Sequence, residues 1–298
     1  MNILVILNSK HHLSKDVNTF LDQIEADDAL QVTLKKTRRK KHAKKLAKKH
    51  GAEKDAVIGI GGDGTFHEMV NGIMMEGHLT NLGFIPNGTG NDYVKMYIAF
   101  SPDDFIERLR SGVYTEVDLG HLKRKKTERY FINIAGVGLD GKVIQLVERS
   151  AERGRSGRLS YANAILRAFF TFRKPHLHIQ GDDFEYRGPV MLLAMCNGRV
   201  FGDGLIIGPQ ASLTSGKMNI TLLGKVTLLD YLLNLGKLKK GRIINHKEVF
   251  YHETTNLRVN RISGEVPGEA DGEVLKMKSF NMRVLPQELT VINEIIEK

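Results

Sequence analysis

Residues 56–65 read AVIGIGGDGT, an apolar run that passes directly into a glycine-rich turn, and residues 82–92 repeat this arrangement as LGFIPNGTGND. Short apolar runs bounded by turn residues predict buried strands. Glycine lets backbone N–H groups approach phosphate oxygens closely, and a helix that begins just after the turn adds its positive end. Both turns also contain Thr, which can donate hydrogen bonds, and Asp, which can hold Mg²⁺ directly or through water. Together they indicate a site for a polyphosphate and its metal ion.

The first 120 or so residues alternate between strand and helix signals. Amphipathic helices separate five predicted strands, which lie at Asn2–Leu7, Gln31–Leu34, Ala56–Ile60, Leu82–Ile85 and Val113–Val117. Such alternation predicts an α/β domain with a mainly parallel sheet in the middle of three layers. Ligands of such sheets bind beyond the carboxyl ends of the strands, where both glycine-rich turns would lie.

After about residue 122 the pattern changes to short β-rich runs, the first at Tyr130–Ile134, with helical stretches near 159–170 and 228–238. Several short strands separated by turns predict a second domain, a mainly antiparallel β-sandwich. The charged stretch Lys123–Arg129 is the expected boundary. We therefore assign residues 1–122 to the first domain and 123–285 to the second, with a final segment of about 286–298 that can return to the first.

The chain is basic, with 44 Lys+Arg against 34 Asp+Glu and a net charge of +10. Ten of these cations fall between Lys35 and Lys49. Such a run can attract anionic lipid, nucleic acid or nucleotide phosphates, or it can be the solvated face of a helix. No aromatic residue interrupts it, and single-stranded nucleic acid needs aromatic platforms for its bases. Nucleic acid is therefore not an expected partner.

The single cysteine, Cys196, stands in an apolar run and is interpreted as a buried small hydrophobe. No disulfide framework or cysteine zinc site can form, which favours a reducing cytoplasm. The amino terminus has no basic leader, and no apolar run approaches the ~20 residues of a membrane-spanning helix. We expect a soluble, cytoplasmic protein.

Two nucleotide-binding patterns need to be set aside. Residues 59–64 formally match the dinucleotide fingerprint G-x-G-x-x-G. That fingerprint expects an acidic residue at the end of the next strand, and Leu82–Pro86 ends without one. The adjacent Asp63 would also place negative charge beside a pyrophosphate, which is reasonable only with a cation present. A Walker A loop is excluded, because no Gly-Lys-Ser/Thr follows the glycines.

The motifs together resemble those of the diacylglycerol kinase catalytic-domain family, in particular its soluble bacterial lipid kinases, within the NAD kinase-like superfamily. The match extends almost from end to end. It consists of GGDGT at 61–65, P-x-G-T-x-N-D at 86–92, V-D-hydrophobic-G at 117–120, F-x-N-x-A-G-x-G at 131–138 and D-G-E at 271–273.

The resemblance implies a kinase that uses ATP and Mg²⁺ to phosphorylate a lipid hydroxyl, in a cleft between a nucleotide domain and a β-sandwich. It implies nucleotide contacts from Thr37, Gly61, Gly62, Asp63, Gly64, Thr65, Glu68, Gly88, Thr89 and Asn91. The metal would be held, partly through water, by Asp63, Asp92 and Asp118. Asp271 would be the base that accepts the hydroxyl proton, and Glu273 would orient Asp271 or a water.

Three departures from the family pattern bear on these assignments. Asn8-Ser9-Lys10 lacks the Pro and Gly of the family's first turn, and His67 replaces the usual Asn before Glu68. The bacterial P-x-A-x-L-x-D-G motif, whose Asp binds a structural Mg²⁺, reads PQASLTSG at 209–216. Ser215 is a poorer Mg²⁺ ligand than a carboxylate, which puts this second metal site in question.

The simplest expected reaction is the conversion of diacylglycerol to phosphatidic acid, on lipid presented at a membrane surface. Two alternatives remain: a kinase of NAD or of a sphingoid-type lipid, and a non-catalytic homologue that binds nucleotide or membrane. The Lys35–Lys49 run is a candidate contact with anionic membrane, and a homodimer is left open. The apolar helix through Leu159, Ala162, Leu166, Phe169 and Phe170 is interpreted as core packing rather than as the border of a lipid pocket.

Overall fold

The computed structural model describes residues 1–10, 12–77, 80–125, 127–154, 158–202 and 204–296. The chain forms two compact units, one of Met1–Leu119 together with the segment from Pro286 onward, the other of Gly120–Leu285. We call them unit 1 and unit 2 and describe each by itself. The sequence-based boundary at residue 122 differs from the structural one by three residues.

Unit 1 alternates strand and helix along the chain. Its elements are β1 (Asn2–Asn8), α1 (Lys15–Glu25), β2 (Gln31–Thr37), α2 (His42–His50), β3 (Ala56–Gly61), α3 (Asp63–Met74), β4 (Asn81–Pro86), the 3₁₀ helix η1 (Tyr93–Met96), α4 (Pro102–Ser111) and the start of β5 (Thr115–Arg124).

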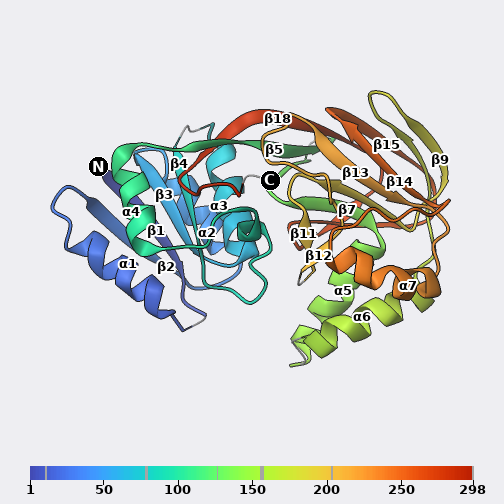
Figure 1. The fold of residues 1–298 in the computed structure, drawn as a ribbon, viewed down its shortest axis with the longest axis horizontal. Helices are drawn as coiled ribbons and strands as arrows, with labels where there is room; N and C mark the ends of the chain where they lie inside the picture. The colour runs from blue at the N-terminus through green and yellow to red at the C-terminus, as the bar shows by residue number, and fades with distance from the viewer. Residues whose placement is uncertain (11, 78–79, 126, 155–157, 203, 297–298) are drawn as a thin grey trace. The chain divides into compact units, whose positions relative to one another are not determined.

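The sheet of unit 1 is parallel, in the order β2-β1-β3-β4, and the end of β18 (Phe280–Val291) adds a further parallel strand beside β4. Helices α1 and α4 pack on one face of this sheet, where the rings of Phe20 and Phe105 meet edge to face at 5.5 Å. Helices α2 and α3 lie together on the other face (Figure 1). The predicted three-layer α/β fold is confirmed, and all the parallel strands end at one edge.

Unit 2 contains most of the strands. Its elements are β6 (Thr127–Phe131), β7 (Ile134–Gly138), α5 (Leu139–Glu152), α6 (Arg158–Thr171), β8 (His176–Gln180), β9 (Glu185–Pro189), β10 (Leu192–Cys196), β11 (Val200–Phe201), β12 (Leu205–Ile206), β13 (Met218–Leu223), α7 (Leu228–Lys239), β14 (Val249–Thr254), β15 (Asn256–Ser263), β16 (Val266–Ala270) and β17 (Glu273–Met277).

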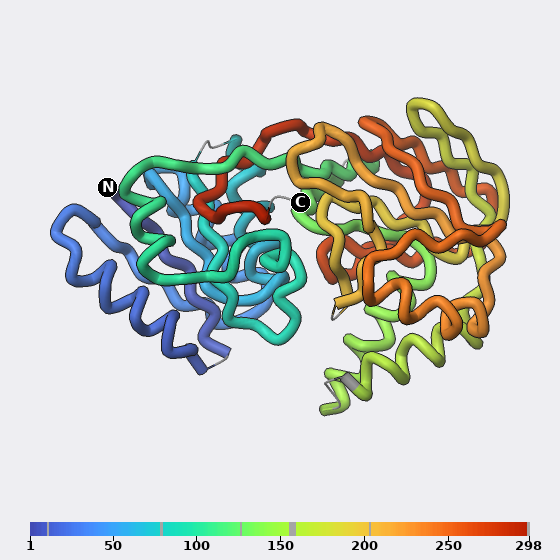
Figure 2. The backbone as a smooth tube through the Cα atoms, viewed as in Figure 1, coloured from blue at the N-terminus to red at the C-terminus, as the bar shows by residue number. Residues whose placement is uncertain are grey.

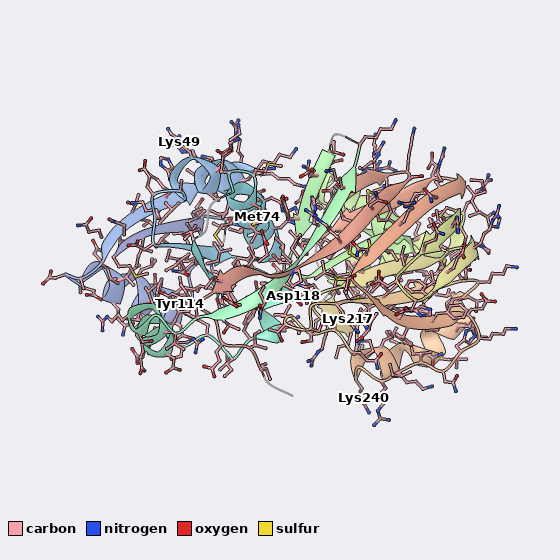
Figure 3. All side chains as sticks on the ribbon, turned by 90° about the horizontal axis from the view of Figure 1, so that it is seen from above. Lys49, Met74, Tyr114, Asp118, Lys217 and Lys240 are labelled. Carbon is pink, nitrogen blue, oxygen red and sulfur yellow. The ribbon has the colours of Figure 1, made fainter. Side chains whose placement is uncertain are left out.

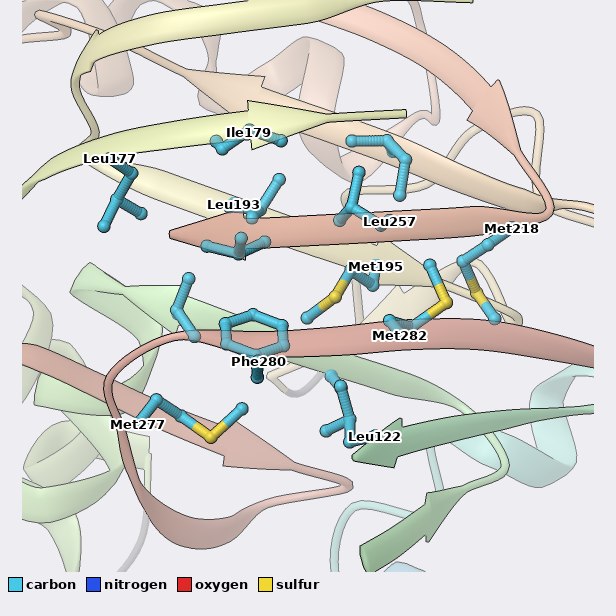
Figure 4. Packing of buried hydrophobic residues seen from close by; sticks show 14 of the residues in the cluster. Leu122, Leu177, Ile179, Leu193, Met195, Met218, Leu257, Met277, Phe280 and Met282 are labelled. Atoms are coloured by element: carbon cyan, nitrogen blue, oxygen red, sulfur yellow. The ribbon is translucent and has the colours of Figure 1, made fainter. Parts of the chain in front are cut away.

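Two antiparallel layers make up unit 2, as predicted. One layer runs β14-β13-β10-β7-β16-β17, and the other contains β9, β8, β15 and the first part of β18. Figure 4 shows their shared core, in which Leu177, Leu193, Met218, Leu257 and Met282 are all at most 1% exposed. Cys196 is fully buried, as expected for a small hydrophobe.

Three local predictions need correction. The charged stretch Lys123–Arg129 is not the boundary but lies within unit 2, where Lys123 pairs with Glu128 and Arg124 with Thr127 in the β5–β6 ladder. The predicted strand Tyr130–Ile134 is divided between β6 and β7. Helix α5 was not predicted, although Val143 and Leu146 on its buried side have helical spacing. It packs on β16 with α6 beside it, on the same side of unit 2 as α7 (Figure 2).

Candidate functional site

Two glycines from different turns touch at the carboxyl-terminal edge of the unit 1 sheet. Strand β3 ends at Gly61 and β4 at Pro86, and these residues are paired, so the turns that follow leave the sheet together. A Cβ atom on Gly88 would lie only 2.6 Å from Cα of Gly62. Because carbon atoms pack best at about 3.5–4.0 Å, this contact requires glycine at position 88. Helix α3 begins just after Gly62, so its unpaired N–H groups and its dipole point to this edge.

The second turn contains two asparagines, and the side chain of Asn91 holds its shape. The side chain of Asn91 accepts a hydrogen bond from the Gly88 N–H (3.0 Å) and donates one to the Gly88 carbonyl (2.8 Å). Asn91 also adopts a left-handed φ of 52°, which Asn tolerates. The Nδ2 group of Asn87 is buried and finds no partner among the described residues. A buried donor without a partner beside a glycine turn fits an anionic ligand. The sequence analysis did not single out Asn87, whereas the predicted contact Thr89 is exposed at the tip of the turn.

Asp63 connects the two turns. It is the first residue of α3, and its carboxylate accepts hydrogen bonds from the backbone N–H groups of Asp92 (3.0 Å) and Tyr93 (2.9 Å). Tyr93 is the first residue of η1, so Asp63 also supplies the negative charge that the start of a helix favours. The side chain that was predicted as both nucleotide contact and metal ligand is therefore also a structural link.

The predicted metal ligands Asp63, Asp92 and Asp118 do not by themselves form a complete metal site. Asp92 pairs with Lys95 at 2.6 Å, and Asp118, 1% exposed in β5, accepts a hydrogen bond from the Gln287 N–H at 3.0 Å. Within the described ranges, no three His, Cys, Asp or Glu side chains are grouped so as to hold a metal ion. Mg²⁺ usually keeps several waters and takes one or two carboxylates together with substrate phosphates. The neighbours Asp63 and Asp92 fit that pattern.

The ends of β1 and β2 complete the same edge of the sheet. Asn8 and Thr37 are paired at these ends. Asn8 donates a hydrogen bond from Nδ2 to the hydroxyl of Thr65 (3.1 Å), and the Ser9 hydroxyl donates to the Thr37 carbonyl (2.7 Å). The predicted nucleotide contacts Thr37 and Thr65 are thus brought to the turns but are nearly buried. Asn8 appeared in the sequence analysis only as part of an altered turn.

Glu68 has a different neighbourhood from the other predicted nucleotide contacts. Its carboxylate accepts hydrogen bonds from the backbone N–H groups of Lys41 (2.5 Å) and Ala43 (3.1 Å). These groups belong to the start of α2, where Lys41 makes no side-chain cap. Glu68 therefore caps α2 from the neighbouring helix. His67 beside it is buried, and the Asn71 side chain donates to its carbonyl (3.0 Å).

In unit 2, Asp271 and Gly272 form the two-residue turn between β16 and β17. Both have left-handed φ angles, 48° and 80°, and Ala270 pairs with Glu273 across them. Such a turn matches the twist of a hairpin and strongly favours Asp-Gly. Glu273, the first residue of β17, is half-buried. The local conformation alone therefore explains why Asp and Gly stand here.

The carboxylate of Asp271 gives this turn a second role, because it binds the F-x-N stretch. Its Oδ1 accepts hydrogen bonds from the N–H groups of Asn133 (2.9 Å) and Ile134 (3.2 Å), and Oδ2 accepts one from Ile132 (3.0 Å). The Asp271 side chain thus accepts hydrogen bonds from three backbone amides. They lie where the predicted strand Tyr130–Ile134 is interrupted between β6 and β7. Two motifs far apart in the sequence therefore meet, and their amides stabilise the negative charge of the aspartate.

A buried acid pair lies behind the Asp271 turn. A Cβ on Gly136 would lie 1.6 Å from Asp140 Oδ2 and 3.3 Å from Glu269 Oε1, so both carboxyl groups crowd the space beside this glycine. Glu269 also accepts the Gly272 N–H at 2.8 Å. Burial raises the pKa of Asp140 to about 7. Burial and the nearby Asp140 also raise the pKa of Glu269 well above its usual range.

This pair makes stability depend on pH. The pKa of Asp140 is about 7 in the folded protein against 3.8 as a free side chain. Protonated Asp140 therefore contributes its full stabilisation below about pH 4. This stabilisation is lost as the pH rises through about 7, because the buried carboxyl group must then ionise. In Asp140→Asn this loss is expected to disappear. The free energy of unfolding should then increase relative to wild type by a few kcal/mol, to an order of magnitude, between about pH 5 and about pH 8.

Urea unfolding at both pH values measures this difference. Asp183→Asn, which changes an exposed carboxylate in the same unit, is the matched control and should follow the wild type. Parallel stability profiles for wild type and Asp140→Asn would contradict the assignment of a protonated buried pair.

Unit 2 also contains an apolar pocket between its sheet and the helices α6 and α7. The space between its walls, counted together with the open solvent at its mouth, is about 930 Å³. Its walls include Ile165 and Phe169 of α6, Leu238 of α7, and Leu192 and Leu223 of the sheet. The interpretation of the α6 side chains as core packing is wrong for most of them: Phe169 lines the pocket, while Leu159, Leu166 and Phe170 are exposed.

The loop at 209–216 closes through its own hydrogen bonds. The Ser215 hydroxyl donates to the carbonyl of Lys217 (3.0 Å) and accepts from the Lys217 N–H (3.2 Å). The Ser212 carbonyl also lies within 3.5 Å of this hydroxyl. Ser215, at the position where the resembling motif has Asp, thus stabilises the turn through hydrogen bonds to the backbone of Lys217.

The comparisons with known proteins agree with this arrangement of motifs. The model of the diacylglycerol kinase catalytic domain matches residues 2–122, and the model of the YegS C-terminal NAD kinase beta sandwich-like domain matches residues 133–293. The chain carries the diacylglycerol kinase catalytic domain and belongs to the family with the YegS C-terminal NAD kinase beta sandwich-like domain. The family's first domain covers both glycine turns, and its C-terminal domain covers the Asp271 turn and the apolar pocket.

Individual relatives within and around this family are distant but cover most of the chain. The Bacillus subtilis diacylglycerol kinase is 26% identical over 248 residues, 79% of each chain. The Yersinia enterocolitica protein named probable lipid kinase YegS-like is 25% identical and spans 96% of this chain and 95% of its own.

Solved structures show the same fold. A diacylglycerol kinase from Bacillus anthracis has a TM-score of 0.72 at 18% identity, covering 98% of this chain and 97% of its own. An NAD kinase from Archaeoglobus fulgidus in complex with ATP has a TM-score of 0.51 at 11% identity, covering 100% and 94%. In the part of the chain that the structure describes, no helix has the length and apolar character needed to cross a bilayer.

Proposed function

We propose that this protein transfers the γ-phosphate of ATP to the hydroxyl of a membrane lipid, with diacylglycerol as the acceptor and phosphatidic acid as the product. Family membership makes it a lipid kinase; the acceptor and the dependence on ATP and Mg²⁺ are the proposal. The observation that carries it is the contact between Gly62 and Gly88, which aligns two glycine turns and the start of α3 at one sheet edge. Backbone N–H groups gathered in this way are suited to phosphate.

Unit 1 would position the triphosphate. The amides of the two turns and the buried Nδ2 of Asn87 would bind phosphate oxygens, and the first N–H groups of α3 would add the positive end of a helix. When bound, Mg²⁺ would offset the charge of these phosphates, held by Asp63 and Asp92 in part through water. Asp118, whose carboxylate accepts a hydrogen bond from the Gln287 N–H, would contribute through water.

Unit 2 would supply the base and bind the acyl chains. Asp271, fixed by three backbone amides, would accept the proton of the acceptor hydroxyl. The hairpin places Glu273 beside this turn, where it would orient Asp271 or a water. The pocket between the sheet and helices α6 and α7 would take part of an acyl chain, since its walls are mainly apolar.

An acceptor screen tests this proposal. The protein is incubated with γ-labelled ATP, Mg²⁺ and one acceptor at a time: diacylglycerol, sphingosine or NAD, with the lipids in detergent micelles. We expect label in phosphatidic acid, because an apolar pocket fits an acyl chain better than a second nucleotide. Label only in phosphosphingosine or NADP would identify one of the other acceptors. ATP binding without any labelled product would identify a non-catalytic homologue.

A further inference from the structure

Helices α6 and α7 each turn one side toward the pocket and expose large apolar side chains on another side. In α6, Tyr161, Ile165 and Phe169 line the pocket, while in α7 this is done by Tyr231, Asn234 and Leu238. At 3.6 residues per turn, a different set of side chains lies on the other side of each helix. This second set is exposed: Leu159 (83%), Leu166 (46%) and Phe170 (76%) in α6, and Leu229 (64%), Leu232 (55%) and Leu233 (72%) in α7.

These six exposed side chains, which we call the outer face, come from helices that contact each other. The rings of Phe169 and Tyr231 meet at 5.4 Å, so the inner sides of α6 and α7 are joined. No residue of α7 is buried, although half of its positions are leucine. A surface helix normally has one apolar stripe and a polar opposite face. Six large apolar side chains gathered on two neighbouring helices therefore indicate a surface that binds a partner.

The charges around the outer face are mainly positive, which favours an anionic partner. The sequence contains no Asp or Glu between residues 158 and 174, and only Asp230 between 225 and 247. Asp230 is occupied by the capping box of α7, where it accepts from the hydroxyl of Thr227 at 2.7 Å. The cations nearby are exposed. They are Arg167 in α6, Arg173 and Lys174 just after α6, and Lys237, Lys239, Lys240 and Arg242 around the end of α7. Figure 3 shows Lys240 extending away from the ribbon.

We propose that the outer face docks on an anionic bilayer, with its leucines and Phe170 entering the acyl boundary and its cations contacting lipid head groups. An apolar helix face bordered by Lys and Arg binds to the interface of such membranes. The proposal rests on the proposed function, since a lipid acceptor resides in the bilayer. The inner sides of the same helices line the apolar pocket, so docking would place this pocket next to the lipid.

This surface differs from the basic run that the sequence suggested. The Lys35–Lys49 run lies in β2 and α2, where Lys48 pairs with Glu76 at 2.7 Å. Lys49 lies at the outer surface of α2 (Figure 3). The exposed large apolar side chains at or near this run are limited, among the described residues of α2 and β2, to Leu34. Charge alone, without apolar insertion, gives weaker membrane binding.

Sedimentation with vesicles tests the docking. Vesicles of phosphatidylcholine and phosphatidylglycerol in about 3:1 ratio are used, with neither ATP nor diacylglycerol, so that binding does not require catalysis. Wild type should bind, and added salt should weaken binding. Leu232→Glu/Leu233→Glu should lower the partition coefficient about tenfold or more, because two apolar groups would be replaced by charges that the bilayer repels.

Two further variants make this comparison specific. Ile262→Glu is the matched control, since Ile262 is a similarly exposed apolar residue (48%) of the same unit outside the outer face, and it should bind like wild type. The substitution of Lys36, Lys41, Lys45 and Lys49 by Gln should have the smaller effect. Full binding by the Leu232/Leu233 variant, or a larger loss in the lysine variant, would overturn the proposal.

Two controls separate membrane docking from self-association and from damage to the fold. Size-exclusion chromatography of wild type and the Leu232/Leu233 variant should give the same monomer mass; a wild-type dimer that the variant abolishes would assign the outer face to a second copy and overturn the proposal. Turnover of a water-soluble dihexanoylglycerol should be equal in both, which shows that the fold and site are intact. Vesicle binding by a wild type that phosphorylates no acceptor would support docking while refuting the proposed function.

Discussion

Replacing Asp271 by Asn is expected to lower the turnover of lipid phosphorylation by about 10²–10⁴-fold, the usual contribution of general-base assistance. Asn is the informative choice because it tolerates the left-handed conformation (φ 48°) of this turn and keeps one acceptor oxygen for the amides of Asn133 and Ile134. Only the hydrogen bond from Ile132 to Oδ2 should be lost. Initial rates with saturating ATP and diacylglycerol measure the effect.

Two measurements separate the chemical role of Asp271 from its structural role. ATP affinity should change less than threefold or so in Asp271→Asn, since the nucleotide turns belong to the other unit. Circular dichroism melting should show a destabilisation of about 1–3 kcal/mol, as expected for one unsatisfied amide. Glu273→Gln, at the first strand position after the turn, should retain most of the turnover. Turnover of Asp271→Asn within about tenfold of wild type would refute the assignment of the base.

Replacing Gly88 by Ala is expected to remove most ATP binding. The added Cβ would lie 2.6 Å from Cα and 3.0 Å from N of Gly62, and these are backbone atoms that cannot rotate away. The two turns would have to separate, at a cost of about 1–3 kcal/mol typical of overpacking. We expect at least a tenfold loss of ATP affinity in isothermal titration calorimetry, because the amides of both turns would lose their alignment.

Gly64→Ala is the matched variant for this experiment. A Cβ on Gly64 would meet no described atom within 4 Å, and Ala favours the helix in which this residue lies, so the fold should be unchanged or slightly more stable. If the phosphates lie against the start of α3, the added methyl group should still weaken ATP binding. Near-normal ATP affinity in Gly88→Ala would contradict the role that we give to the contact between the turns.

The sequence predicted the α/β unit well, because its central strands β1, β3 and β4 are short apolar runs that end at turn signals. Gly61 and Pro86 follow such runs, so the edge where the turns meet could be foreseen from parallel pairing alone. The existence of the β-sandwich was also predictable. Helix α5 was missed because it directly follows Gly138 and its apolar positions are interrupted by charged ones.

The hydrogen-bond partners of individual side chains could not be predicted from the sequence. Glu68 stands next to the GGDGT motif, yet it caps α2, because the packing of α2 on α3 brings the Lys41 and Ala43 amides within reach. Asn87 could not be distinguished from an ordinary turn residue until its amide proved to be buried without a described partner. The exposure of Phe170 was unpredictable for the same reason: helical spacing shows which residues share a face, but not what covers that face.

Asp63 has a structural role as well as that of a candidate ligand, since its carboxylate binds the amides of Asp92 and Tyr93 next to the start of α3. Removing its carboxylate should release the second loop from the first, so that melting temperature and nucleotide affinity fall in step even in magnesium-free buffer. Asp63→Asn, which keeps one acceptor, should recover part of both. An engineer who wishes to alter the ion preference of this protein would therefore do better to begin at Asp92. Its carboxylate pairs with the flexible side chain of Lys95, whereas Asp63 holds backbone amides.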